Sequence, residues 1–266
     1  MLFYFSGIVM KVFKFGGASV KDATSVKNAV EILKGFKGEK LLVVISAMGK
    51  TTNALEKVVN DYFFSKGNAH TSLKEVRDYH QQIMEELFSE KTNPVFDKVN
   101  NFFVEADWML DEKPQHTYSF VYDQIVSLGE LISTCIVSAY LEQQGCSNIW
   151  LDVRDVLMTD NTYREAKVDW QKSEMLVQKQ VVPVFNRVDV IITQGFIGGT
   201  SENYTTTLGR EGSDYTAAIF AYLLDAEAMY IWKDVPGVLN ADPKFYKDAQ
   251  KLYQISYHDA IELAYY

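Results

Sequence analysis

The segment Lys14-Phe15-Gly16-Gly17, near the amino end, combines the residue types that bind a phosphate chain. It follows a short apolar run and precedes a helical pattern, so we expect a strand, a glycine turn and a helix N-terminus. Adjacent glycines let the backbone approach a ligand, helix N–H groups attract anions, and the lysine adds a mobile positive charge. Because the lysine precedes the glycines, the segment is not a P-loop of the Gly-x-x-x-x-Gly-Lys type.

A second candidate segment, residues 44–53, leaves a predicted strand and enters a predicted helix through small hydroxyl residues. Ligands bind at the carboxyl ends of parallel strands, so Ser46 and Thr52 are candidates for a binding site. A strand-to-helix loop in which Thr51 or Thr52 caps the helix explains the same residues, and taken alone the segment favours that explanation.

Glu130 interrupts an otherwise apolar helical pattern. A buried carboxylate without a partner is costly, so Glu130 needs a cation. A ligand ammonium or a structural arginine would satisfy it, and the pattern favours neither.

Glycine and threonine cluster between Gly195 and Gly212, before a predicted helix that Ser213 opens. Arg210 offers a planar guanidinium suited to a carboxylate. Asp214 falls in the first helical turn, where an acid is also expected as compensation for the helix dipole. The density of glycine and hydroxyl residues favours a ligand-binding loop.

A further polar segment follows the predicted strand at residues 228–232. Lys233, Asp234 and Lys244 are suited to contact the ribose and phosphates of a nucleotide. A β-turn with solvated charges explains them equally well.

The elements that position these residues follow from short apolar runs that alternate with longer helical patterns. This alternation predicts an α/β fold, a three-layer αβα sandwich with a largely parallel central sheet. The predicted strands are residues 12–15, 41–45, 149–153, 181–185, 190–193 and 228–232. The predicted helices are residues 20–36, 51–65, 71–88, 94–110, 119–143 and 213–224. Residues 53–116 lack a strand candidate, and we interpret them either as a helical excursion beside the substrate entrance or as helices that cover one face of the sheet.

The composition narrows the classes of function. The chain has 266 residues and a formal net charge of −9, which argues against binding of nucleic acid, since that needs a basic field. The first ten residues are apolar but too short to span a bilayer, and no stretch elsewhere reaches a transmembrane length without charges, so we expect no membrane and a cytoplasmic protein. Cys135 and Cys146 lie outside any metal-binding pattern, we predict no metal ligands from the side chains, and we expect free thiols.

Six motifs in this order resemble the catalytic domain of aspartate kinase, in the amino acid kinase superfamily. They are Lys-Phe-Gly-Gly, Ser-Ala-Met-Gly-Lys-Thr-Thr-Asn, Leu-Gly-Glu, Gln-Gly-Phe-Ile-Gly, Leu-Gly-Arg-Glu-Gly-Ser-Asp-Tyr and Trp-Lys-Asp-Val-Pro-Gly. The resemblance covers residues 10–266. It implies phosphorylation of the β-carboxylate of L-aspartate by ATP with Mg²⁺, which gives 4-phospho-L-aspartate, the first step of lysine, threonine and methionine biosynthesis.

The resemblance also implies roles for the candidate residues. The ATP-binding set is Lys14, Phe15, Gly16, Gly17, Lys233, Asp234 and Lys244. The aspartate-binding set is Ser46, Thr52, Glu130, Arg210 and Ser213. Lys14 and Asp214 would be catalytic, with Asp214 organising the phosphate and magnesium region.

The resemblance leads to further expectations and leaves alternatives. We expect residues 10–266 to form a catalytic domain truncated at its carboxyl end, residues 1–9 to be an extension, regulatory domains to be absent, and the protein to be a homo-oligomer. Two residues depart from the family pattern, Glu211 where many relatives have glycine and Lys233 in place of a common threonine. The alternatives are a kinase acting on glutamate, acetylglutamate or a nucleotide, and a ligand-binding module with weak or no catalysis.

Overall fold

The computed structural model describes residues 9–235 and 237–265, which form two compact units that divide after Trp232. Of the predicted extension, residues 1–9, all but Val9 lies outside the described residues.

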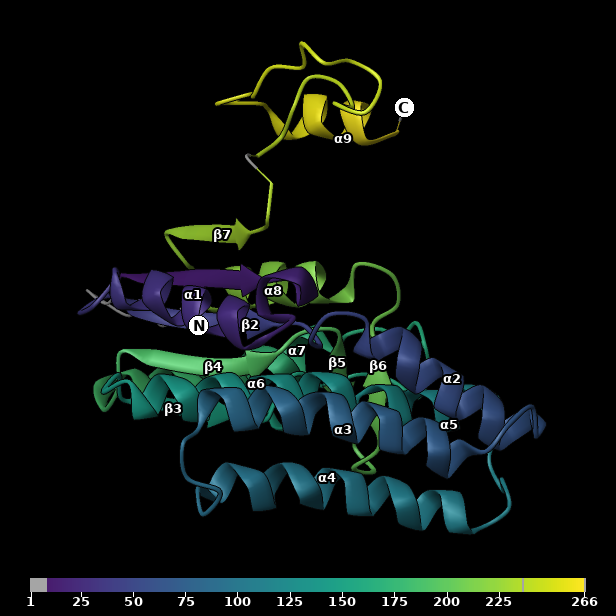
Figure 1. The fold of residues 1–266 in the computed structure, drawn as a ribbon. Coiled ribbons are helices and arrows are strands. Elements are labelled where there is room, and N and C mark those ends of the chain that lie inside the picture. The colour runs from purple at the N-terminus through teal and green to yellow at the C-terminus, as the bar shows by residue number, and fades with distance from the viewer. Residues whose placement is uncertain (1–8, 236, 266) are drawn as a thin grey trace. The chain divides into compact units, whose positions relative to one another are not determined.

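The first unit is built on five strands that pair in parallel in the order β3-β4-β2-β1-β7 (Figure 1). Their bounds are β1 Met10–Phe15, β2 Lys40–Ile45, β3 Asn148–Leu151, β4 Val190–Gln194 and β7 Ala228–Trp232. In the central strand β2 the sequence Leu41-Leu42-Val43-Val44-Ile45 is buried throughout, because helices cover both faces. The predicted parallel sheet is confirmed.

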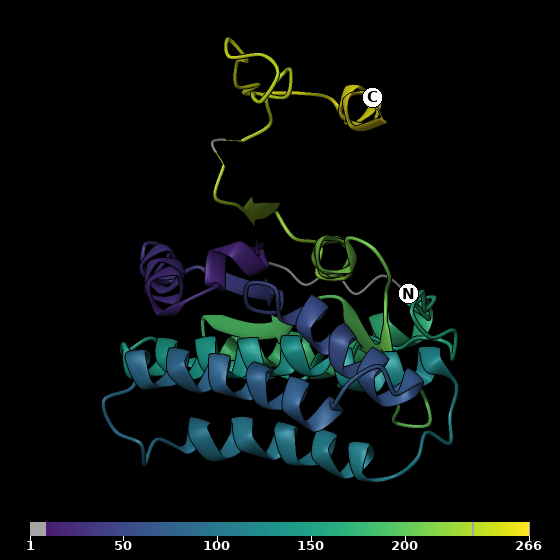
Figure 2. The same cartoon turned by 45° about the vertical axis from the view of Figure 1, so that its right-hand side comes forward.

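Helices cover the two faces of this sheet, which confirms the predicted three layers. In Figure 2, α1 (Ala23–Lys34) and α8 (Gly212–Leu223) lie on opposite sides of β1. Helix α6 (Leu128–Gln143) packs on the sheet together with α1. Helix α7 (Trp170–Leu176) leads on the other side into η3 (Val177–Val181) and η4 (Val182–Asn186), and there the Gln178 side chain donates to the Leu223 carbonyl of α8 (3.0 Å).

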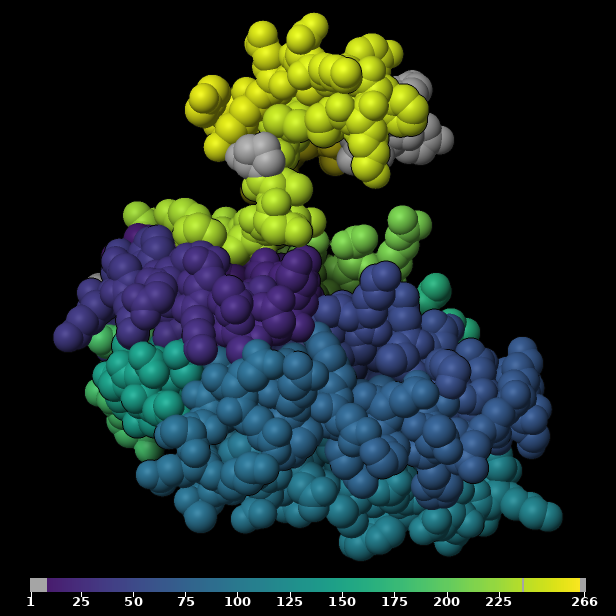
Figure 3. All heavy atoms as spheres, viewed as in Figure 1, coloured from purple at the N-terminus to yellow at the C-terminus, as the bar shows by residue number. Residues whose placement is uncertain are grey.

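The helical excursion is confirmed. It contains α2 (Thr51–Phe64), α3 (Ala69–Leu87) and α4 (Pro94–Asp111), and α5 (Tyr118–Val126) follows it. Helices α3 and α4 pack on each other, and α4 packs on α6, so they add a layer outside α6 that covers this side of the unit (Figure 3). The first turn of α2 instead points at the cavity described below.

Helices α5 and α6 follow each other closely and form an apolar stretch, Tyr118–Gln143, that is long enough to cross a membrane by length and composition. Of its most apolar window, 83% is buried inside the protein. Packing in the core therefore accounts for its apolar character.

The predicted strand at residues 181–185 is wrong, because this segment is helical in η3 and η4. Pro183 has no N–H to donate to a sheet but fits the first turn of a helix. The buried residues Val177, Val181 and Phe185 repeat every four positions, which is helical spacing rather than alternation.

Three short elements were not predicted from the sequence. They are η1 (Gly17–Val20), η2 (Val153–Asp155) and an antiparallel ribbon of β5 (Ile197–Gly199) and β6 (Thr205–Thr207). The ribbon lies within the stretch that the sequence presents as a loop. Its strands are too short to show a period of two.

The second unit, from Lys233, holds one described helix, α9 (Tyr257–Tyr265), and a bridge between Leu239 and Lys251. Aromatic side chains in it are largely exposed, among them Tyr253 and Tyr257.

Candidate active site

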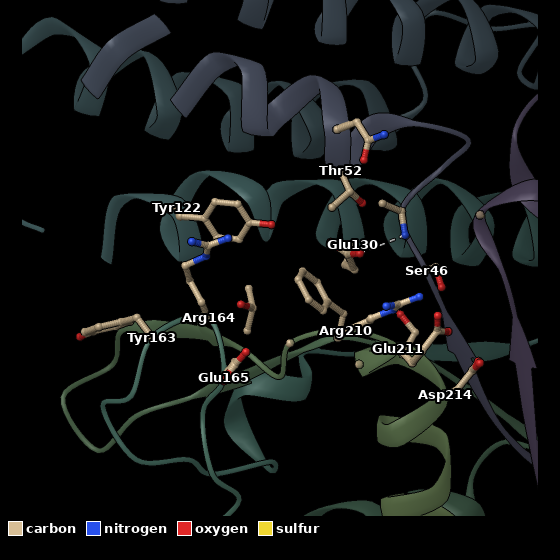
Figure 4. Close-up of a pocket in the computed structure, with 18 of the residues that line it drawn as sticks. Ser46, Thr52, Tyr122, Glu130, Tyr163, Arg164, Glu165, Arg210, Glu211 and Asp214 are labelled. Atoms are coloured by element: carbon tan, nitrogen blue, oxygen red, sulfur yellow. Dashed lines mark hydrogen bonds between the residues drawn. The ribbon is translucent and has the colours of Figure 1, made fainter. Parts of the chain in front are cut away.

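A cavity of about 850 Å³ opens in the first unit at the carboxyl ends of β1 and β2. Residues far apart in the sequence line it, from the end of β1, the β2–α2 turn, α5, α6, the turn at residues 162–165 and the start of α8 (Figure 4). Eight candidate residues are among its lining: Lys14, Gly17, Ser46, Thr52, Glu130, Arg210, Ser213 and Asp214. Candidate segments that are far apart in the sequence, and that local structure alone could each explain, therefore meet in one cavity.

Two glycine turns form one wall of the cavity. A Cβ on Gly17 would lie 2.6 Å from the Ala47 carbonyl oxygen, so only glycine allows this approach. The Gly49 N–H donates to the Gly17 carbonyl (3.0 Å), and Gly49 has a φ of +56°. Tyr79 of α3 donates to the Lys21 carbonyl, which ties the helical excursion to this wall.

Lys14 and Asp214 form an ion pair inside the cavity. The Lys14 Nζ lies 2.5 Å from the Asp214 Oδ1, and only 8% of the lysine side chain is exposed. Strand β1 supplies the lysine and the first turn of α8 supplies the aspartate. Gly16 lies beside this ammonium group, because a Cβ at Gly16 would be 3.6 Å from it.

Glu130 lies on α6 and is 2% exposed. The Ala47 N–H donates to its Oε1 (3.3 Å), and its Oε2 has no hydrogen-bond partner among the residues that the structure describes. Burial raises the pKa of Glu130 to about 8. The structural arginine that the sequence left open is not found within residues 9–235, so a ligand cation is the partner that would satisfy this group.

The loop before α8 is held close to the cavity by tight packing. A Cβ on Gly195 would lie 2.6 Å from the Ser213 Cβ. Arg210 is exposed and lines the cavity, and no hydrogen bond or ion pair of its guanidinium is found among the described residues. Glu211 follows with a φ of 56°, the left-handed region that favours glycine. This geometry fits the glycine that the resemblance implies at this position.

The Phe15 side chain does not line the cavity. Phe15 is 1% exposed and stacks on Trp232 inside the core, so only its backbone is available to a ligand. Lys233, Asp234 and Lys244 belong to the second unit.

Some lining residues lie outside every candidate segment and were missed by the sequence patterns: Ser119, Tyr122, Thr162, Tyr163, Arg164 and Glu165. Others lie within candidate segments but were given no role: Gly49, Asn53, Phe196, Thr207, Gly209, Glu211 and Gly212. Behind them lies Asp123, fully buried, which accepts from the backbone N–H groups of Arg164 and Thr207 (2.9 Å each) and from the Thr207 hydroxyl (2.8 Å). Burial raises the pKa of Asp123 to about 6. An acid within an apolar helix is the signal that singled out Glu130, and it was available for Asp123 too.

The cavity therefore combines a buried carboxylate, an exposed guanidinium and a paired lysine beside a glycine turn. Such a set can hold an ammonium group, a carboxylate and a phosphate chain at once. No histidine is among the described residues that line it.

Comparison of the sequence with known proteins identifies the family of the chain. A model of the amino acid kinase family matches residues 10–266. The chain is 32% identical to lysine-sensitive aspartokinase 3 of Escherichia coli (strain K12), over 95% of this chain and 55% of that protein. It is 30% identical to the aspartokinase of Chlamydia trachomatis, again over 95% and 55%. The chain thus spans about half the length of these relatives.

Solved structures of aspartate kinases have the same fold as this chain. The structure of E. coli aspartokinase III in complex with aspartate and ADP matches with a TM-score of 0.87 at 32% identity, over 97% of this chain and 56% of that one. The aspartate kinase of Clostridium acetobutylicum shares the fold, with a TM-score of 0.78 at 23% identity over 97% and 55%.

Proposed function

The chain belongs to the amino acid kinase family, and from this premise we propose that it transfers the terminal phosphoryl group of ATP to the side-chain carboxylate of L-aspartate. The relatives at about 30% identity are named aspartokinases, and one was solved with aspartate and ADP. The observation that carries the proposal is the buried Glu130, whose unpartnered Oε2 needs a cation. The ammonium group of an amino acid supplies one.

The need of Glu130 for a cation distinguishes between possible phosphoryl acceptors. Aspartate and glutamate carry a free ammonium, whereas N-acetylglutamate does not and would leave Glu130 without a cation. Arg210 is suited to take the α-carboxylate, and Ser46, Thr52 and Ser213 offer hydroxyl groups around it. The side-chain carboxylate is then free to face Lys14 and Asp214.

The chemistry fits a site without a histidine. The acceptor carboxylate has an ordinary pKa near 3.9 and is ionised at neutral pH, so no general base is needed. It attacks the terminal phosphorus, the bond to the bridging oxygen breaks, and ADP leaves with that electron pair. The problem left is the repulsion between two anions, which Lys14, the turn at Gly16 and Gly17, and the first turn of α8 reduce.

Mg²⁺ accompanies ATP in this proposal. The ion is held mainly by phosphates and water with one or two carboxylates, and Asp214 is a carboxylate suitably placed beside Lys14. When bound, it neutralises charge on the phosphates. Lys233, Asp234 and Lys244 remain our proposed contacts to the nucleotide, and we propose a cytoplasmic homo-oligomer in lysine, threonine and methionine biosynthesis.

The test is ADP release with Mg-ATP and a panel of L-aspartate, L-glutamate and N-acetyl-L-glutamate, with the acyl phosphate trapped as its hydroxamate. We expect turnover with L-aspartate to exceed that with the others. A preference for another acceptor would contradict the proposal. Calorimetric binding of aspartate and an ATP analogue without turnover would instead support a ligand-binding module.

A further inference from the structure

Arg164 lines the same cavity, and no role has been assigned to it. Its φ is +74°, in the left-handed region that costs free energy for any residue other than glycine. Backbone strain of this kind persists only where the surroundings impose it, and it is concentrated at functional sites.

Asp123 imposes this conformation. Its carboxylate accepts the Arg164 N–H at 2.9 Å, and it is itself fixed by two hydrogen bonds from Thr207 of β6. Because Asp123 is fully buried on α5, the turn at residues 162–165 is anchored to both α5 and β6. The side chain of Arg164 therefore starts from a defined position.

The guanidinium of Arg164 lies beside two aromatic rings. It lies over the ring of Tyr122, 4.6 Å from the centroid, and 5.6 Å from that of Tyr118. Within the described parts of the chain, no ion pair or hydrogen bond of this guanidinium is found. A cation–π contact does not use up the N–H donors of a guanidinium, so those of Arg164 are available for a carboxylate.

Arg164 and Asp214 lie on opposite sides of Glu130 (Figure 4). A group bound at Arg164 is therefore away from the end of the cavity where Lys14 pairs with Asp214. In the proposed function the reacting carboxylate must face that end. Resting on that function, we propose that Arg164 positions the acceptor by binding its α-carboxylate, from the side opposite Arg210.

The test compares Arg164→Gln with the wild type by calorimetry, using L-aspartate and its α-amide, which lacks the α-carboxylate charge. We expect the variant to bind L-aspartate about tenfold more weakly, while its affinity for the α-amide changes less than twofold. L-Asparagine keeps the α-carboxylate, so any affinity for it should fall as for aspartate.

Two further variants separate binding from folding. Arg164→Gly relieves the left-handed strain, so it should be at least as stable as the wild type and still lose aspartate affinity. Arg187→Gln removes an arginine that does not line the cavity and should bind aspartate normally. Equal effects of Arg164→Gln on aspartate and the α-amide, or no effect on either, would overturn the inference alone. A wild type that binds no aspartate would overturn the proposed function as well.

Discussion

Lys14 and Asp214 pair at 2.5 Å although one ends the first strand and the other begins α8. The pair joins two segments that the sequence presented separately. Because the lysine side chain is only 8% exposed, its position is fixed by the fold rather than by a flexible surface contact. A positive charge fixed in this way is suited to stabilise charge that moves during phosphoryl transfer.

Replacing Lys14 with alanine tests this role. We expect Lys14→Ala to lower kcat by about 10²- to 10³-fold, the usual effect of removing one group that stabilises developing charge. Far-ultraviolet circular dichroism should show that the fold is kept, since β1 stays apolar and paired on both sides.

The matched control is Lys11→Ala on the same strand. Lys11 pairs with Glu39, which is 40% exposed, so this pair contributes little and kcat should stay near the wild-type value. Near-normal turnover of Lys14→Ala would remove Lys14 from the mechanism.

Glu130→Gln should raise the free energy of unfolding and lower the affinity for aspartate. The pKa of Glu130 is about 8 in the folded chain and 4.5 ordinarily. Below pH 4.5 both states hold the proton, and between pH 4.5 and 8 only the unfolded chain releases it, so wild-type stability falls over this range. The variant lacks this loss, and we expect its free energy of unfolding at pH 8 to exceed that of the wild type by about 1–3 kcal/mol.

Urea unfolding at pH 5 and pH 8 measures this difference. Glu86→Gln, at an exposed position of α3, is the control and should show no such gain. The gain of Glu130→Gln should come with a loss of aspartate affinity of at least tenfold. A variant that binds aspartate normally would show that Glu130 does not hold the ammonium.

Aspartate binding should depend on pH for the same reason. An ammonium needs the ionised carboxylate, so the affinity of the wild type should rise by up to tenfold per pH unit from pH 6 to about 8 and then level off. Calorimetry in buffers of different ionisation enthalpy should detect proton release on binding. Glu130→Gln should remove most of this dependence, and a slope that persists between pH 6 and 8 in the variant would show that Glu130 is not the group whose ionisation controls binding.

The sheet could be predicted from the sequence because its buried strands are continuous apolar runs. Residues 41–45 and 190–193 are such runs, of strand length and rich in β-branched residues. The run at residues 181–185 misled because a buried helical turn and a buried strand look alike over five residues, and Pro183 was the signal that distinguished them. The ribbon of β5 and β6 depends on pairing between segments, which a single local pattern does not contain.

The site could be predicted only where its residues stand out in their own segment. Glu130 stands out in an apolar helix, and Lys14 beside two glycines. Tyr122 and Arg164 look ordinary, and they gain a role only because Asp123 brings the turn at residues 162–165 against α5. Such residues are identified by tertiary contacts, so no spacing along the chain marks them.

Glu211 gives a last prediction, because it stands at a left-handed position with a φ of 56°. A non-glycine residue there costs about 1–2 kcal/mol, and glycine removes this cost but loses more chain entropy on folding. We expect Glu211→Gly to raise the free energy of unfolding by about 0.5–1 kcal/mol, measured by urea denaturation. Glu202→Gly, in an exposed turn without a positive φ, should be neutral or destabilising. If Glu211→Gly is instead less stable than the wild type, contacts of the carboxylate outweigh the backbone strain, and the departure from the family pattern is stabilising in this chain.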